Sequence, residues 1–348
     1  MVMRGTGRRR PTLEQVAVLA GVGRGTVSRV INGSPRVSEQ TRAAVQSAVA
    51  ELGYVPNRAA RALAAGSTDA IALVVPEHEN RLFVEPYFSG IVRGVGSALA
   101  DADLQLLLTL IRDRKERERF AQYASAHRVD GVLLVSVHAD DPLPELLDSI
   151  GMPAVLGGRR SLEETASFVD CDNHGGARAA VAHLLARGRR TIATVTGPPD
   201  MYVARCRLDG YRAALRAAGC PPDESLVVYG DFTEESGHRA TGELLRRRPD
   251  LDAVFCASDL TASGARLALR EAGRAVPEDV ALVGFDDSSV ARHMDPPLTS
   301  VRQPMEEMGR EMARLLLERL AARDDPAVPL PVSRSTLLPT ELVHRRSS

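Results

Sequence analysis

The chain of 348 residues contains no tryptophan, and aromatic residues make up only 4% of it. Its hydrophobic cores must therefore be built mainly from aliphatic side chains. Long hydrophobic runs are also missing: stretches such as ALVV and LQLLLTLI are far shorter than the roughly 20 residues that a membrane helix needs. No apolar segment follows the basic N-terminus, so no secretory signal peptide is expected. We predict a soluble, cytoplasmic protein with no membrane partner.

Signatures of catalysis and of metal binding are missing as well. The four cysteines include no CxxC pair and no metal-like spacing to histidine, which is typical of reduced thiols. The one lysine, Lys115, lies in a charged run rather than a phosphate-binding loop, and neither GxSxG nor HExxH occurs. We therefore predict no enzyme, no metal and no cofactor. A sugar- or nucleotide-processing enzyme is kept as an alternative.

Charge is distributed unevenly along the chain. Residues 1–66 carry ten arginines, no lysine and three glutamates, a net charge of +7, whereas the remainder carries −8. A basic segment on an acidic body indicates that a polyanion binds at one end only. A solvated basic tail would give the same imbalance, so the residue pattern has to distinguish the two.

Three short helices are predicted within residues 11–56, after a basic tail, 1–10, that we expect to be disordered. Thr12 and Gln15 have the spacing of a capping box at the start of the first helix. A glycine-containing turn then leads into the second helix, GRGTVSRVIN, and Ser38 can cap the third. This order is typical of a helix-turn-helix DNA-binding domain.

In such a domain the second helix enters the major groove, and its first residues contact base edges. Arg24 and Arg29 can each form a two-pronged hydrogen bond with guanine, so we expect them to read bases. The hydroxyl groups suit phosphate contacts. A solvent-exposed face on a three-helix unit is the alternative. The residues of this unit predicted to contact DNA are Thr12, Leu13, Arg24, Gly25, Thr26, Ser28, Arg29, Asn32 and Arg36.

The segment 57–68 predicts a short alanine-rich helix and a flexible exit, and this helix has too little apolar surface to be stable alone. From Asp69 onward, apolar runs of four to seven residues alternate with helical segments. Repeated strand–helix units predict parallel sheets covered on both faces. Two such series predict an α/β core, 69–348, of two similar lobes with a cleft between them.

Residues 12–63, TLEQVAVLAGVGRGTVSRVINGSPRVSEQTRAAVQSAVAELGYVPNRAARAL, resemble the DNA-binding head and hinge of the lactose-repressor/galactose-repressor family of bacterial transcription regulators. VSRVIN, LGYVPN and RAARAL are the most specific pieces. Later segments such as ARCRLDGYRAAL, VGFDD and PPLTSVRQP are also similar to the family pattern. The resemblance covers nearly everything after residue 10.

The resemblance implies a homodimer in which each head binds one half of a near-palindromic operator. It implies a hinge helix that forms on DNA, with contacts from Asn57 and Ala60 and with Leu63 wedged into the minor groove. It also implies a core of two doubly wound parallel-sheet lobes of the periplasmic-binding-protein type. On this basis we place the first lobe at about 69–167 plus 301–328 and the second at about 168–300 plus 329–345.

In this family a small effector, a sugar or sugar derivative, binds in the cleft and alters operator affinity through its preference for one lobe arrangement. By family position Arg205 is the strongest candidate contact, since a guanidinium can bind hydroxyls or a carboxylate. Asp286 ends a strand at the edge where open α/β sheets bind ligands, whereas Asp287 is expected to be structural. The other predicted effector contacts are Tyr87, Phe88, Ser136, Phe232, Ser258 and Asp259.

At two places the sequence departs from the family pattern, so the family's effector and operator sequence cannot simply be assumed for this chain. Gly157-Gly158-Arg159 stands where many members have an aspartate, which removes an acceptor and argues against an ordinary hexose. Arg24-Gly25 replaces a bulkier polar pair, so the operator sequence does not transfer. We predict a sequence-specific, ligand-responsive regulator, a repressor rather than an activator. A transport receptor with the same core and no role on DNA is the alternative.

Overall fold

The computed structural model describes residues 11–31, 34, 36–54, 67–77, 79–324 and 333–348. The chain forms two compact units, one up to Thr68 and the other from Asp69 to Ser348. The predictions for the tail 1–10 and for four DNA-contact candidates lie outside the described residues. These four are Asn32, Asn57, Ala60 and Leu63.

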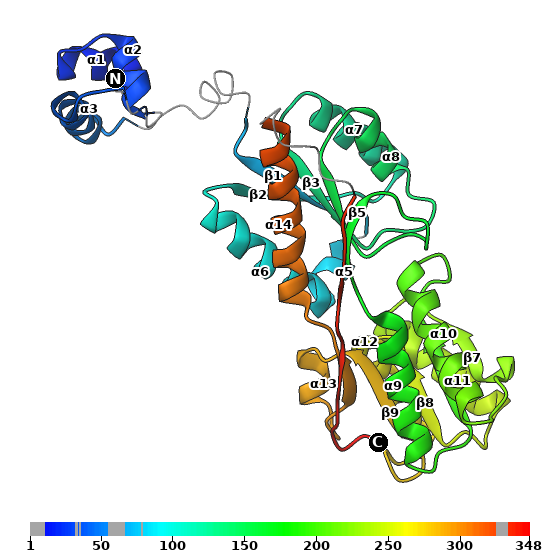
Figure 1. Ribbon diagram of the computed structural model, residues 1–348. Coiled ribbons are helices and arrows are strands. Elements are labelled where there is room, and N and C mark those ends of the chain that lie inside the picture. The colour runs from blue at the N-terminus through cyan, green and yellow to red at the C-terminus, as the bar shows by residue number, and fades with distance from the viewer. Residues whose placement is uncertain (1–10, 32–33, 35, 55–66, 78, 325–332) are drawn as a thin grey trace, which may run out of the picture. The chain divides into compact units, whose positions relative to one another are not determined.

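The described part of the first unit is built from the helices α1 (Leu13–Ala20), α2 (Arg24–Ile31) and α3 (Glu39–Leu52), which Figure 1 shows. Each helix buries one face in a small aliphatic core. Gly21 ends α1 with a φ of 67°, a left-handed conformation that glycine adopts at little cost. The tight turn lets α2 follow α1 after three residues, as the sequence predicts. The buried core residues are Val16, Ala17, Val27, Val30, Val45 and Ala48.

The predicted capping box is confirmed at the start of α1. The backbone N–H of Thr12 donates to Gln15 Oε1 at 2.9 Å, and that of Gln15 donates to Thr12 Oγ1 at 3.4 Å. Two amides that would otherwise lack partners are thereby satisfied. Ser38 likewise accepts a hydrogen bond from the backbone N–H of Thr41 at the start of α3.

Replacing Thr12 by alanine should destabilise α1 by about 1 kcal/mol, because the cap hydroxyl is lost. Hydrogen exchange of the α1 amides in the full chain would measure this as faster exchange. Thr12→Ser keeps the hydroxyl and should restore protection. Equal exchange in the wild type and in Thr12→Ala would show that the cap contributes nothing.

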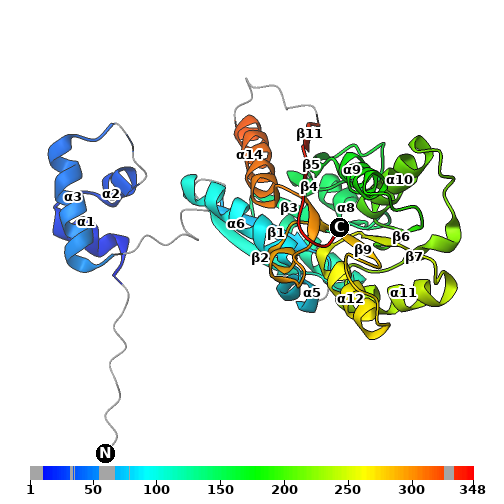
Figure 2. The ribbon, with the colours of Figure 1, turned by 90° about the horizontal axis from the view of Figure 1, so that it is seen from below.

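The second unit contains two six-stranded sheets, each with helices on both faces (Figures 1 and 2). The alternation of strands and helices predicted from Asp69 onward is confirmed. The first sheet is entirely parallel, in the order β11-β5-β4-β3-β1-β2. Its strands are β1 (Ala70–Val75), β2 (Gln105–Leu110), β3 (Gly131–Val135), β4 (Ala154–Gly157), β5 (Ser167–Cys171) and β11 (Ser335–Leu338).

Two aliphatic cores sandwich this sheet. Helices α6 (Pro86–Asp101) and α14 (Met305–Asp324) pack together on one face, with α5 (Glu79–Val84) beside α6. Helices α7 (Arg114–Ser125) and α8 (Leu143–Ser149) cover the other face. The β1 side chains Ile71 and Leu73 belong to the first core, whereas Ala72 and Val74 belong to the second. This alternation explains why the strand reads as one continuous apolar run.

The second sheet has the order β12-β10-β9-β8-β6-β7, and only its edge pair β10–β12 is antiparallel. Helices α9 (Asn173–Ala186) and α10 (Tyr202–Ala217) cover one face, and α11 (Glu234–Arg247) and α12 (Asp259–Glu271) cover the other. The short α13 (Ser289–His293) and a 3-10 turn, Glu224–Leu226, complete this lobe. Its strands are β6 (Ile192–Thr196), β7 (Val227–Tyr229), β8 (Ala253–Cys256), β9 (Ala281–Asp286), β10 (Thr299–Arg302) and β12 (Glu341–Val343).

The predicted lobe boundaries need correction at three strands. β5 pairs with β4 and β11 pairs with β5, so both belong to the first lobe and not to the second. β10 pairs with β9 and lies wholly in the second lobe. Strands this short have little pattern of their own, and their partners are distant in sequence. The chain therefore crosses between the lobes three times, after β5, β10 and β11.

Candidate functional site

Helix α2 presents a polar face to solvent opposite the buried Val27 and Val30. Arg24, Gly25 and Arg29 are exposed on this face. Thr26 and Ser28 are half-buried beside them, and Arg36 is exposed beyond the helix. The structure therefore gathers the predicted α2 contacts on one surface. Thr12 and Leu13 instead begin α1, where the Thr12 hydroxyl already caps the helix.

Three contacts fix the surroundings of this face. Arg24 Nη1 lies 3.1 Å from Glu14 Oε1 of α1, and both side chains are largely exposed. Beyond α2, Arg42 donates from Nη2 to the Ser34 carbonyl at 2.8 Å, and the Ser34 N–H donates to the Arg29 carbonyl at 2.9 Å. Arg42 thus holds the chain that leaves α2, a role that the sequence did not single out.

A pocket lies between the two lobes, at the carboxyl ends of their strands. Open α/β sheets bind ligands at this edge, so its position matches the predicted cleft. Both lobes contribute to the wall, together with two of the crossover segments. The lining consists of Arg81, Glu85, Tyr87, Ser136, Val137, Gly157, Gly158, Arg159, Asp170, Asn173, Met201, Val203, Arg207, Phe232, Asp286, Gln303 and Met308.

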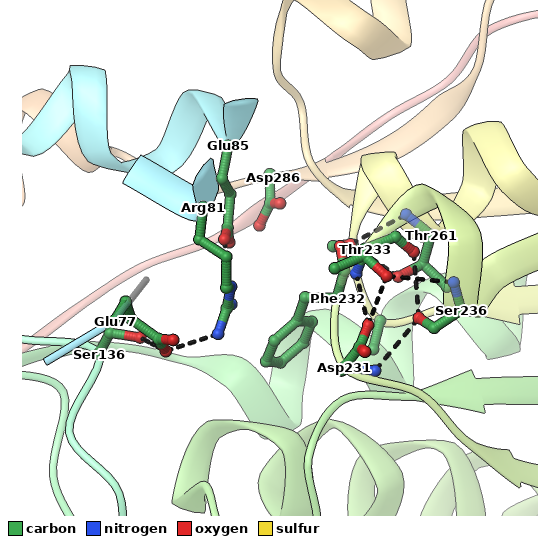
Figure 3. A network of polar contacts seen from close by, with 12 residues as sticks. Glu77, Arg81, Glu85, Ser136, Asp231, Phe232, Thr233, Ser236, Thr261 and Asp286 are labelled. Carbon is green, nitrogen blue, oxygen red and sulfur yellow. Dashed lines mark hydrogen bonds and ion pairs between the residues drawn. The ribbon is translucent and has the colours of Figure 1, made fainter. Parts of the chain in front are cut away.

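Charged side chains in the pocket occur in compensating pairs. Arg81, from α5, contacts Glu77 at 2.5 Å and Glu85 at 3.0 Å, as Figure 3 shows. Arg159 Nε lies 3.3 Å from Asp170 Oδ2. Three arginines and three carboxylates line the pocket, so its formal charge is zero. Burial raises the pKa values of Glu85 and Asp170 despite the neighbouring arginines.

Asp286 ends β9 with a φ of 113°, a conformation that is rare for residues other than glycine. Gln303 Nε2 donates to Asp286 Oδ1 at 2.6 Å, and Arg207 Nη1 lies 3.8 Å from the same oxygen. Burial raises the pKa of Asp286 well above its usual value. Strained, buried polar residues of this kind gather at binding sites. The predicted position of Asp286 at the cleft therefore agrees with the structure.

The arginine of α10 that lines the pocket is Arg207, two residues after the predicted contact Arg205. Arg205 does not line the pocket. Its Nη2 donates to the Arg160 carbonyl of the other lobe at 3.0 Å. Arg207 lines the pocket instead, with Nε donating to Asn173 Oδ1 at 2.9 Å and its guanidinium 3.8 Å from the centre of the Phe285 ring. Helical spacing could have found it, because Arg207 shares the buried face of Ala204, Leu208 and Tyr211.

Three other candidates lie outside the pocket lining. Phe88 is 2% exposed and packs in the core between α6 and the first sheet. Ser258 caps α12, where its Oγ accepts from the backbone N–H of Thr261. Asp259 accepts hydrogen bonds from the Ser288 N–H at 2.7 Å and from Ser300 Oγ at 2.6 Å. Such groups satisfy local backbone and side-chain donors. Tyr87, Ser136 and Phe232 do line the pocket, as predicted.

The aromatic residues give the pocket its apolar surfaces. Phe232 follows β7 with a φ of 68°, and both Arg81 and Arg207 lie within 6 Å of its ring centre, at 5.9 and 5.7 Å. Figure 3 shows the ring pointing from the second lobe toward Arg81. Tyr87 meets Phe88 edge to face, and burial raises the pKa of its phenol. Among the described residues, no cluster of three or more histidine, cysteine, aspartate or glutamate side chains is arranged to hold a metal.

Comparison with known proteins identifies the family. Residues 12–57 match the bacterial regulatory proteins of the lacI family, and residues 181–348 match the periplasmic binding protein-like domain. The HTH-type transcriptional regulator CelR of Thermobifida fusca is 56% identical over 342 residues, which cover 98% of this chain and 99% of that protein. This chain belongs to the LacI family. It is a DNA-binding transcriptional regulator, as the sequence predicts.

Solved structures place this LacI-family regulator beside two relatives. The transcriptional regulator CelR–cellobiose complex is 54% identical, with a TM-score of 0.77, over 97% of this chain and 100% of that chain. The lac repressor dimer bound to operator and the anti-inducer ONPF is 29% identical, with a TM-score of 0.86, over 97% and 99%. The predicted helix-turn-helix head and two-lobed core are confirmed. No described helix is long and apolar enough to cross a membrane.

Proposed function

We propose that this regulator is a repressor whose operator affinity is set by a neutral sugar of the cellobiose class, bound in the pocket between the lobes. The charge-balanced pocket carries this proposal. Each of its arginines already faces a carboxylate of the protein, so a sugar phosphate would find no unpaired cation. Hydroxyl groups, in contrast, can accept from arginines and amides and donate to carboxylates.

The departure at Gly157-Gly158-Arg159 supports a sugar larger than one hexose. Gly158 has a φ of 88°, and a Cβ added there would meet only Val203, at 3.8 Å. The pocket wall is therefore open beside Gly158, whereas a Cβ added at Gly157 would meet Val135 at 2.8 Å and Met312 at 2.9 Å. Arg159 lies 4.8 Å from the Tyr202 ring, so an extended planar surface borders the opening. The CelR relative was solved with cellobiose.

We infer the following division of roles. Arg207, Asp286 and Gln303 contact sugar hydroxyls, while Phe232 and Tyr87 pack against the faces of the sugar ring. Arg24 and Arg29 of α2 read operator bases, and Thr26, Ser28 and Arg36 contact phosphates. The operator is near-palindromic and is bound by a homodimer, the state in which the lac repressor structure was solved.

Exposed apolar side chains support the homodimer. Leu107 and Leu108 are 37% and 41% exposed on β2, which ends the first sheet. A sheet edge with exposed leucines suits contact with a second subunit. We further infer that the protein acts in the cytoplasm and releases its sugar unchanged, and chromatography of cellobiose after incubation with the protein would test the latter.

Cellobiose should release the protein from operator DNA, and Asp286→Ala should weaken this response about tenfold without changing operator binding, because a hydrogen-bonding partner of the sugar is lost. Footprinting on DNA around its own gene would locate the operator, and fluorescence anisotropy would then follow release. Glucose and glucose 6-phosphate provide the comparison ligands. Asp209→Ala, which removes an exposed carboxylate of α10, is the matched control. A wild-type response from Asp286→Ala would place the sugar elsewhere.

A further inference from the structure

A histidine bridges the two lobes beside the pocket. His138 follows β3 in the first lobe, and its Nδ1 lies 2.5 Å from Oδ2 of Asp200, in the loop before α10 of the second lobe. The backbone adds a parallel contact, since the N–H of Ala139 donates to the Asp200 carbonyl at 3.2 Å. The contact thus joins segments that can separate only when the lobes open.

The other ring nitrogen also faces a carboxylate. His138 Nε2 lies 3.5 Å from Oε1 of Glu77, which follows β1. Carboxylates only accept hydrogen bonds, and a neutral imidazole has a single N–H to donate. Both ring nitrogens can therefore act as donors only when the ring is protonated. The geometry itself selects the imidazolium form in this arrangement of the lobes.

This contact is continuous with the pocket wall. Val137 and Met201, the immediate neighbours of His138 and Asp200, both line the pocket. Glu77 accepts a hydrogen bond from Ser136 Oγ at 2.7 Å and pairs with Arg81 (Figure 3). A chain of polar contacts thus runs from Asp200 through His138 and Glu77 to Arg81 in the pocket wall.

We propose that His138 and Asp200 form a proton-dependent clasp that holds the two lobes closed over the pocket, so that effector binding takes up a proton. The inference takes only the identity of the ligand, cellobiose, from the proposed function. The contact between His138 and Asp200 is a property of the two lobes and does not depend on which ligand binds.

The direction of the pH dependence follows from the carboxylates around the ring. Hydrogen bonds to Glu77 and then to Asp200, together with their charges, outweigh burial and raise the pKa of His138 from 6.5 to about 9. When the lobes open, Asp200 moves away from His138 while Glu77 stays beside it. The pKa of His138 is therefore lower in the open form. Arg81, which pairs with Glu77 from its far side, limits how strongly Glu77 alone can hold the proton. The clasp is fully formed at low pH and is lost as the pH rises through about 9.

Calorimetric titration with cellobiose from pH 6 to pH 9.5 would test the linkage. We expect the affinity of the wild type to fall at least about fivefold between pH 7 and the upper limit, and at most about tenfold per pH unit. His138→Gln keeps a donor for Asp200 but cannot titrate, so the loss of affinity with rising pH should be much smaller than in the wild type. Titration in buffers of different ionisation heat should show proton uptake by the wild type alone.

His238→Gln is the matched control. His238 Nε2 lies 2.7 Å from Glu271 Oε2, but both residues belong to the second lobe, on α11 and α12. This variant should retain the full pH dependence of the wild type. A loss of pH dependence in His238→Gln, or a wild-type pH profile in His138→Gln, would overturn the clasp.

A readout without ligand keeps the two proposals distinguishable. The lobes of the ligand-free protein exchange between the open and closed forms. NMR titration of selectively labelled histidines, with His138 assigned from the signal missing in His138→Gln, should therefore give a midpoint above that of a free histidine and below about 9. Asp200→Asn should lower this midpoint, because it removes the carboxylate that only the closed form supplies. An unchanged midpoint in Asp200→Asn would overturn the clasp. If Asp200→Asn lowers the midpoint of His138 but cellobiose binds at no pH, only the proposed ligand is refuted.

Discussion

Arg207→Ala is expected to weaken cellobiose binding at least about a hundredfold, because hydrogen bonds from a charged donor to the sugar contribute about 1.5–3 kcal/mol each and are lost. The Arg207 guanidinium contacts Asn173, the Ala257 carbonyl and Asp286. Its loss leaves Asp286 buried without a neighbouring cation, so the pKa of this carboxyl should rise further. Isothermal titration calorimetry would measure the affinity, and operator binding without sugar would show that the head is intact.

Arg205→Ala is the matched control on the same helix. Arg205 donates to the Arg160 carbonyl at an exposed position outside the pocket, so its loss should change affinity less than about fivefold. Arg207→Lys keeps the charge but cannot direct two donors in a fixed plane, and it should fall between the two. Comparable losses in Arg205→Ala and Arg207→Ala would show that the pocket wall is not where the sugar binds.

The contrast between these two arginines shows what the sequence could and could not predict about the pocket. The family pattern located the segment ARCR, but it did not determine which arginine points inward. Helical geometry determines that, because Arg207 follows Ala204 by three residues on the buried face. The same limit applies at Tyr87 and Phe88. These are neighbours on α6 that point in different directions, one into the pocket and the other into the core.

Local patterns predicted local structure well. The Thr12–Gln15 capping box, the turn at Gly21 and the alternation of strands and helices in the core all follow from residues close together in sequence. Pairing between distant segments did not follow from such patterns. β11 joins β5 across more than 160 residues, which no spacing rule reveals.

The pocket depends on those distant segments. Asn173 begins α9, directly after the crossover that follows β5, and Gln303 lies in the crossover after β10. Arg81 reaches the pocket from α5 and Glu85 from the position before α6, and the two side chains are paired and half-buried there. Charged residues usually face solvent, so no sequence pattern singles these two out. Only the fold shows that their charges compensate one another.

Arg29→Ala is expected to weaken operator binding by about 1–3 kcal/mol, or roughly 5- to 150-fold, at fixed salt concentration. Arg29 is exposed on the polar face of α2, where its guanidinium can reach a guanine in the major groove. Arg24 must first leave Glu14, a surface ion pair worth at most about 1 kcal/mol, so Arg24→Ala should have the smaller effect. Fluorescence anisotropy on the footprinted operator and on random DNA would measure both losses.

The comparison of the two DNAs decides what Arg29 does. A base contact predicts a larger loss on operator than on random DNA, whereas a phosphate contact predicts equal losses and a shallower salt dependence. Arg29→Lys sharpens this test because it keeps the positive charge and removes the two-pronged donor. It should retain affinity for random DNA while losing preference for the operator. Because Gly25 has no side chain to reach a base, we propose that Arg29 and Arg24 supply most of the base recognition by this helix. A lysine that preserved full preference would contradict that proposal.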